Sequence, residues 1–293
     1  MSGFSRTWRV PEVAGLRFAR MRSLIFWAVL VAIGVAVWVL SSSLYQPVVP
    51  AVTFPGGALV DLSHAYGSET IFWPTAAGGF MLHKDADGVT PAGYYYSANS
   101  FSTAEHGGTH IDAPVHFAQG HQSVDQIPLE RFFGHAVVVD VRQQSEGSAD
   151  YQVTVNDLAH AEAEQGAMTS DSIVLLRTGF SSRWPDAARY LGTAERGEAA
   201  VPKLHFPGLH PDAAKWLVAK SVRAVGIDTA SIDYGQSTLF ESHRILYAAD
   251  LPAFENLTSL ERLPLRGAFI VALPMKIAHG TGAPLRAVAI LPK

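Results

Sequence analysis

Four side chains that can bind a divalent metal ion lie within eleven residues, at His106, His110, Asp112 and His116. They are four, two and four residues apart, and the positions between them hold mainly small or turn-forming residues. Neutral imidazoles and a carboxylate are borderline-to-hard ligands that suit Zn²⁺, Mn²⁺ or Fe²⁺. The glycine pair after His106 allows the backbone to fold closely around an ion. The spacing therefore predicts a metal site in this segment.

Two other interpretations of the cluster compete with a catalytic metal site. Histidines at helical spacing are often surface residues or hydrogen-bonded core residues, but a buried Asp112 among imidazoles would be costly unless it were paired or bound to metal. A structural zinc site usually uses cysteine ligands and closes all four positions. The chain has no cysteine, which also excludes disulfides and thiol nucleophiles. A catalytic metal site is therefore the favoured interpretation.

Further motifs downstream resemble those of a known family. They are Val225-Gly-Ile-Asp-Thr-Ala-Ser-Ile-Asp233, Glu241-Ser-His243, Phe254-Glu-Asn-Leu257 and Thr281-Gly-Ala-Pro-Leu-Arg286. With the complete pattern H-x-G-T-H-x-D-A-P-x-H that begins at His106, they resemble the cyclase family of metal-dependent hydrolases. That family includes the bacterial kynurenine formamidases (arylformamidases) and the isatin hydrolases. The resemblance extends from about Asp61 to Lys293.

The resemblance implies a ligand set for one or two divalent ions, Zn²⁺ or Mn²⁺. One ion would be held by the first cluster, and Asp112 would bridge to a second ion. The implied metal ligands are His106, His110, Asp112, His243 and Glu255.

The last histidine of the cluster has a different implied role. His116 would be the general base and acid, which suits an imidazole whose ordinary pKa is near 6.5. The alternative is that His116 is a further metal ligand. Three protein ligands with open positions are typical of a catalytic site, where the ion acidifies water for attack on a carbonyl carbon.

The expected function is hydrolysis of aryl amides. The resemblance implies an arylformamidase that converts N-formylkynurenine to kynurenine and formate in tryptophan catabolism. The alternative is a hydrolase or cyclase acting on cyclic amides such as isatin. A different class, an inactive membrane-tethered scaffold that binds metal, is disfavoured by the complete ligand set. The aromatic side chains of Phe72, Trp73 and Phe117, with Tyr94 and Tyr95, could stack on such a substrate, although core packing is the competing explanation.

The N-terminus predicts membrane attachment. Residues 24–40 carry no charge, and the run continues weakly to residue 44, close to the roughly 20 residues that span a bilayer. Five arginines precede it in residues 1–23, so the N-terminus is expected in the cytoplasm and the following domain outside. Trp27 and Trp38 stand near its ends as interfacial anchors. The alternative is a cleaved signal peptide and a secreted or periplasmic enzyme.

The remaining chain predicts one α/β domain. Residues 45–59 hold three prolines and no charge, as expected of a linker, and residues 60–293 form the catalytic domain. Apolar runs at 136–139, 172–176, 224–227 and 269–273 are typical of buried strands, while 155–165, with Asn156 as N-cap and Gly166 at its end, and 211–220 predict helices. The family resemblance implies the swivelling β/β/α variety of this fold.

The sequence supports further expectations about local structure and partners. We expect the segment from His106 to Asp112 where a strand ends in a tight turn or short helix, and His243 in a polar loop. The net charge of −4 gives no reason to expect a nucleic-acid partner. We expect a small-molecule substrate and a homo-oligomer, either a dimer or a tetramer.

Overall fold

The computed structural model describes residues 26–36, 38 and 56–293. The chain divides into two compact units, Met1–Thr53 and Phe54–Lys293. In the first unit, residues 26–36 and 38 are helical. Within the described residues, no helix is both long enough and apolar enough to cross a membrane. The expected basic terminus, residues 1–23, lies outside the described residues. So do residues 24, 25, 37 and 39–44 of the expected anchor and residues 45–55 of the expected linker.

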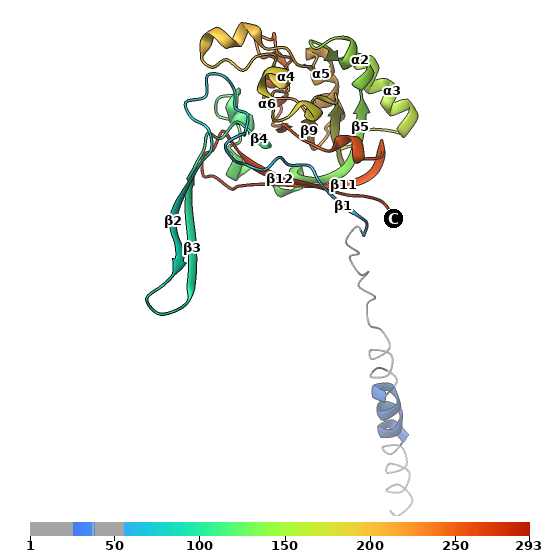
Figure 1. Ribbon diagram of the computed structural model, residues 1–293. Helices are drawn as coiled ribbons and strands as arrows, with labels where there is room; N and C mark the ends of the chain where they lie inside the picture. Colours follow the sequence, from blue (N-terminus) through green and yellow to red (C-terminus); the bar gives the residue numbers. More distant parts are fainter. Residues whose placement is uncertain (1–25, 37, 39–55) are drawn as a thin grey trace, which may run out of the picture. The chain divides into compact units, whose positions relative to one another are not determined.

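The second unit mixes strands and helices (Figure 1). Its strands are β1 (Leu59–Asp61), β2 (Met81–Val89), β3 (Tyr95–Ser102), β4 (His110–Asp112), β5 (Phe133–Asp140), β6 (Gln152–Val153), β7 (Ser172–Arg177), β8 (Gly208–Leu209), β9 (Ala224–Ile227), β10 (Ala253–Glu255), β11 (Arg266–Pro274) and β12 (Gly282–Ile290). Its α-helices are α2 (Arg142–Gly147), α3 (Val155–Gln165), α4 (Ala187–Leu191), α5 (Pro211–Lys220) and α6 (Glu241–Tyr247). The expected α/β class is therefore confirmed.

The main sheet closes on itself through the short strand β4. Its order is β1-β12-β11-β5-β7-β9-β10-β4, and β4 also pairs with β12. The central strands β5, β7, β9 and β10 run parallel, whereas β4 is antiparallel to both of its neighbours. The strand β4 therefore completes the ring.

Side chains on each parallel strand alternate between two cores, as the period of two residues in a strand requires. On β7, Ile173 and Leu175 join the core enclosed by the closed sheet. Val174 and Leu176 join the core between the sheet and the helices α3, α5 and α6. Because both faces are buried, these strands are continuous apolar runs. This explains why the strands β5, β7 and β9 could be predicted from the sequence.

The two longer helices lie at their expected positions. The helix α5 begins with Pro211, whose missing N–H is not needed in the first turn. The helix α3 ends at Gly166, which has φ 87°. Its N-cap is Thr154 and not Asn156 as expected: the Thr154 side chain accepts from the Asp157 N–H, and the Asp157 carboxylate accepts from the Thr154 N–H. This reciprocal capping box fixes the start of the helix.

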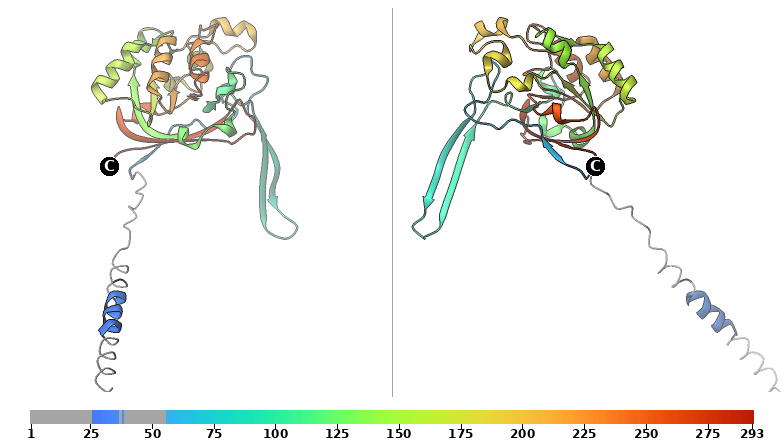
Figure 2. Two further views of the ribbon diagram at one scale, coloured as in Figure 1. Left: turned by 180° about the vertical axis from the view of Figure 1, so that it is seen from behind. Right: turned by 45° about the vertical axis from the view of Figure 1, so that its right-hand side comes forward.

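The strands β2 and β3 form a long two-stranded ribbon that projects from the domain (Figures 1 and 2). Side chains on both of its faces are exposed, including Leu82, Val89, Tyr95 and Phe101. Such a ribbon has no buried face, so its sequence shows no sustained alternation that would predict it. Tyr94 and Tyr95 lie on this ribbon.

Candidate metal centre

Two short strands bring the first acidic and basic groups together. In the antiparallel pair of β4 and β10, His110 lies opposite Glu255, and Asp112 lies opposite Ala253. Residues two apart on a strand share a face, so His110 and Asp112 point to the same side as Glu255. The intervening Ile111 is fully buried on the other face. The alternation thus separates a polar cluster from the apolar core.

His243 reaches this cluster from the helix α6, and not from a polar loop as expected. Its Nε2 lies 3.3 Å from Asp112 Oδ2 and 3.3 Å from Glu255 Oε1. The helix begins here because the Asp233 carboxylate accepts from the backbone N–H groups of Ser242 and His243, at 3.2 and 3.0 Å. This cap comes from several residues upstream of α6, so the sequence next to the helix does not reveal its start.

His106 lies in the turn that precedes β4. Its Nδ1 is 2.7 Å from Asp112 Oδ1. The ring sits above Gly282 on β12, where a Cβ would come within 2.5 Å of His106 Cε1. The segment therefore runs from a turn into a strand, and Pro114–His116 then form a 3₁₀ helix. The tight turn was expected, but the strand β4 that follows it and carries His110 and Asp112 was not.

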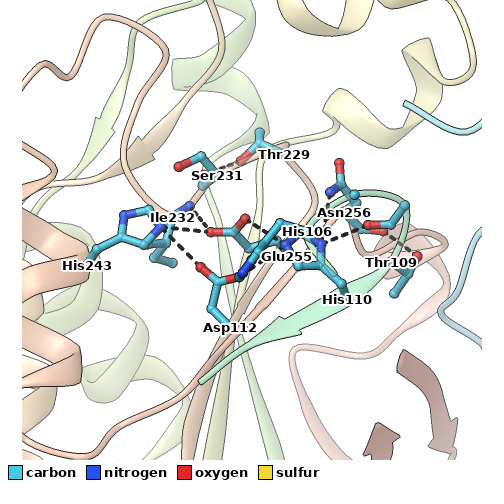
Figure 3. Close-up of polar contacts among 12 residues, drawn as sticks. His106, Thr109, His110, Asp112, Thr229, Ser231, Ile232, His243, Glu255 and Asn256 are labelled. Atoms are coloured by element: carbon cyan, nitrogen blue, oxygen red, sulfur yellow. Dashed lines mark hydrogen bonds and ion pairs between the residues drawn. The ribbon is translucent and has the colours of Figure 1, made fainter. Parts of the chain in front are cut away.

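The five side chains form two groups that share one carboxylate (Figure 3). His106, His110 and Asp112 make the first, and Asp112, His243 and Glu255 make the second; in each group the ligand atoms lie within 4.8 Å of one another. All except His106 are nearly inaccessible to solvent. Buried imidazole and carboxylate groups with this separation suit one or two divalent ions.

Hydrogen bonds fix the orientation of two of the imidazoles. His110 Nδ1 lies 3.0 Å from the Gly108 carbonyl oxygen, which can only accept, so this nitrogen carries the proton. His243 Nδ1 lies 2.5 Å from Asp233 Oδ2. In both residues Nε2 is left facing the carboxylates. Such outward hydrogen bonds are typical of metal-binding histidines.

The electrostatics of the two carboxylates differ. Burial alone would raise the pKa of Asp112, but the surrounding imidazoles, above all His106 and His116, hold that pKa well below its ordinary value. Burial, followed by the nearby Asp112 carboxylate, raises the pKa of Glu255. Two acidic groups held this close in a buried site favour a bound cation between them.

His116 is placed differently from the other histidines. It belongs to neither of the two groups among the described residues, and its ring stacks on His106 with centroids 3.8 Å apart. Burial lowers the pKa of His116 to about 4. Within the described part of the chain, neither of its ring nitrogens has a hydrogen-bond partner, so both remain available to water or substrate.

The residues of the cluster line a cavity of about 370 Å³. The expected aromatic residues Phe72, Trp73 and Phe117 all line it. Phe240, which sequence reasoning missed, packs against Phe117 with ring centroids 5.2 Å apart. Tyr94 and Tyr95 do not line this cavity, because they lie on the projecting ribbon.

Two residues that contact the cluster also received no role from the sequence. Tyr247 donates a hydrogen bond to Asp112 Oδ2 at 2.8 Å. It stands four residues after His243, one helical turn along α6, so a helix prediction for this segment would have found it. Asp233 lies in a family motif, but only the structure shows that it holds both the His243 ring and the start of α6.

The chain is similar to known proteins in both sequence and fold. The family described as "Cyclase: Putative cyclase" matches residues 60–234. Isatin hydrolase from Roseibium aggregatum is 32% identical over 224 residues, which cover 72% of this chain and 81% of that protein. Kynurenine formamidase from Salinibacter ruber is 30% identical over 238 residues, which cover 79% and 96%. The solved structure of isatin hydrolase A from Ralstonia solanacearum matches with a TM-score of 0.71 and 33% identity, over 80% of this chain and 92% of that one.

The chain belongs to the cyclase family of metal-dependent hydrolases. It is an enzyme of the hydrolase class, as its sequence motifs predicted.

Proposed function

We propose that this enzyme hydrolyses amide bonds attached to an aromatic ring, at a divalent metal centre. The observation that carries the proposal is the pair of groups sharing Asp112 beside an aromatic-lined cavity. The proposed ligands are His106, His110 and Asp112 for one ion, and Asp112, His243 and Glu255 for a second. Zn²⁺ and Mn²⁺ both suit this set of donors.

The protein side chains divide the work of hydrolysis. A bound divalent ion would polarise the amide carbonyl and make water acidic enough to act as a nucleophile near neutral pH. His116 would take the proton from that water and pass it to the leaving nitrogen, because it lines the cavity outside the ligand groups. Tyr247, through its hydrogen bond to Asp112 Oδ2, would hold that carboxylate in place.

The walls of the cavity support an aromatic substrate. Phe72, Trp73, Phe117 and Phe240 line the same cavity as the cluster. Aromatic rings favour offset or edge-to-face contacts with one another, which would hold a flat substrate while its amide meets the metal centre. N-formylkynurenine is one such substrate, and its hydrolysis to kynurenine and formate would place the enzyme in tryptophan catabolism.

A cyclic aryl amide such as isatin is the second candidate. The similarity to isatin hydrolases at 32% and 33% identity favours it, since the compared formamidase is 30% identical. Ring opening of isatin and deformylation of N-formylkynurenine both require attack of water on an amide carbonyl. In both substrates the nitrogen of that amide is bonded to an aromatic ring. The same protein groups would serve either reaction.

The decisive experiment assays both substrates with the purified full-length enzyme, before and after treatment with a chelator. We expect turnover of at least one substrate, its loss on chelation and its recovery when Zn²⁺ or Mn²⁺ is restored. Turnover that survives complete removal of metal would contradict the proposal. Stoichiometric metal without turnover of any aryl amide would favour the inactive scaffold.

We further propose that the N-terminal segment attaches the enzyme to a membrane, with the catalytic domain on the outer side. The apolar run at residues 24–44 and the preceding arginines support this. A reporter fused after residue 293, active only outside the cytoplasm, tests the orientation. Fractionation tests attachment, because a cleaved signal peptide would release a shortened soluble enzyme.

We also propose that the enzyme forms a homo-oligomer. An isolated two-stranded ribbon is marginally stable in water, and β2 and β3 expose Leu82 and Phe101 on one face. Contact with another subunit would cover them. Light scattering on the wild type and on a Leu82→Glu variant tests this, and a monomeric wild type would contradict it.

A further inference from the structure

His106 differs from the other two histidines of the cluster in the ring nitrogen that faces the carboxylates. It presents Nδ1 to Asp112 Oδ1 at 2.7 Å, whereas His110 and His243 present Nε2. The outward nitrogen of His106 is therefore Nε2. It lies 2.9 Å from the hydroxyl oxygen of Thr281.

The partner of that hydroxyl decides the direction of this hydrogen bond. Thr281 Oγ1 donates to Glu105 Oε2 at 2.6 Å. A hydroxyl has one proton and an ionised carboxylate has none, so the Thr281 proton is committed to Glu105. The contact with His106 must then use the Nε2–H as donor and the hydroxyl oxygen as acceptor. This places the proton of the neutral ring on Nε2 and leaves the lone pair of Nδ1 directed at the cluster.

Backbone contacts hold the carboxylate itself in position. Glu105 Oε2 also accepts from the backbone N–H of Thr281 at 2.9 Å and from that of Gly282 at 3.3 Å. Three donors on one oxygen leave the carboxylate little freedom to rotate. Because Glu105 directly precedes His106, the same contacts fasten the turn that carries the histidine to Thr281 and Gly282, at the start of β12.

We propose that Glu105 and Thr281 form a positioning relay that holds His106 in the tautomer able to bind metal through Nδ1. The proposal rests on the proposed metal centre and adds two residues that do not touch the ion. The relay fixes the ring of His106 through a hydrogen bond at its outward nitrogen. The Gly108 carbonyl does the same for His110, and the Asp233 carboxylate does the same for His243. Groups of this kind typically change metal affinity or activity by about 10-fold to 100-fold when removed.

The test measures zinc affinity and needs no substrate. Full-length wild type and the variant Thr281→Val, which keeps the shape of the side chain but lacks the hydroxyl, compete with a chromophoric chelator for Zn²⁺. We expect Thr281→Val to bind at least one Zn²⁺ about 10-fold or more weakly. Thr281→Ser restores the hydroxyl and should bring the affinity back to within about threefold of the wild type.

A control variant and a stability measurement separate positioning from general damage. Thr103→Val removes a nearby hydroxyl that donates only to the Ala104 carbonyl, at 3.0 Å, and should leave zinc affinity unchanged. The melting temperature of each variant without metal reports on folding alone. A merely structural role for Thr281 would lower that temperature, whereas a positioning role lowers zinc affinity at an unchanged melting temperature.

A second variant keeps the proposal falsifiable if Thr281→Val folds poorly. In Glu105→Ala the Thr281 hydroxyl loses its acceptor and is free to donate to His106 Nε2, so the tautomer is no longer fixed, and zinc binding should weaken in the same direction. Wild-type affinity in Thr281→Val, or failure of Thr281→Ser to restore it, would overturn the relay. A wild type that binds no zinc or manganese would instead remove the proposed metal centre, and the relay with it.

Discussion

Glu255 lies opposite His110 across two antiparallel strands, and its Oε2 is 3.5 Å from His110 Nε2. Each of these strands is only three residues long. The cluster therefore depends on the register between β4 and β10: a shift by one residue would turn every ligand on one strand toward the apolar core. Ile111 and Phe254, fully buried on the other face, hold that register.

The shared carboxylate should be the least replaceable group of the centre. Asp112→Ala removes a ligand from both groups at once, so we expect loss of bound metal and a fall in turnover of at least about 10³-fold. Elemental analysis and a hydrolysis assay on the same sample measure both. Asp85→Ala, which removes an exposed carboxylate on β2, is the matched control. An active Asp112→Ala variant without metal would refute the site.

Much of the domain could be predicted because its main signals are local. The strands β5, β7 and β9 are buried on both faces and appear as apolar runs, and α5 starts at a proline. The ligand motif from His106 to Asp112 is contiguous, so the residue types and their spacing alone indicate its chemistry.

The remaining features depend on contacts between distant segments. The strands β4 and β10 are too short to show a period, and their pairing is visible only in the folded chain. The helix α6 is capped by Asp233 and not by a residue at its own N-terminus, which is why the sequence around His243 predicts a loop. The ribbon of β2 and β3 has no buried face and carries a register shift between Lys84 and Ala86.

Removal of His116 should separate catalysis from metal binding. Because His116 lies outside both ligand groups, His116→Ala should retain metal while turnover falls by about 10²-fold to 10⁴-fold, the usual contribution of general acid–base catalysis. His83→Ala, an exposed histidine on β2, serves as the control. Unchanged turnover would assign His116 a structural role, and loss of metal would make it a ligand.

Gly282 should be as important for metal binding as His106, whose ring lies above it. A Cβ at this position would lie 2.5 Å from His106 Cε1 and 2.8 Å from the backbone oxygen of Ile111, which cannot move without disturbing β4. We expect Gly282→Ala to displace His106 and to weaken metal binding by about 10-fold or more, as judged by chelator competition. Gly78→Ala, where a Cβ meets no atom within 4 Å, should bind metal normally. Equal affinities in the two variants would show that His106 is not held by this contact.

Stability should depend on the protonation of His64, which belongs to neither ligand group of the metal cluster. Its ring stacks on Trp184 with centroids 4.1 Å apart, and its buried Nε2 has no hydrogen-bond partner among the described residues. Burial lowers the pKa of His64 to about 4. Since the ordinary value is near 6.5, the unfolded chain takes up this proton first as the pH falls.

The sign of the effect follows from that order of protonation. Stability from the neutral ring of His64 is fully present above roughly pH 6.5 and decreases as the pH falls toward 4. His64→Phe keeps a ring against Trp184 but cannot be protonated. Between pH 6.5 and 4.5, the free energy of unfolding should therefore fall less in His64→Phe than in the wild type. The difference between the two falls should be on the order of 2 kcal/mol. Urea unfolding at both pH values measures the difference, and parallel losses in the two proteins would show that His64 is not protonated on unfolding.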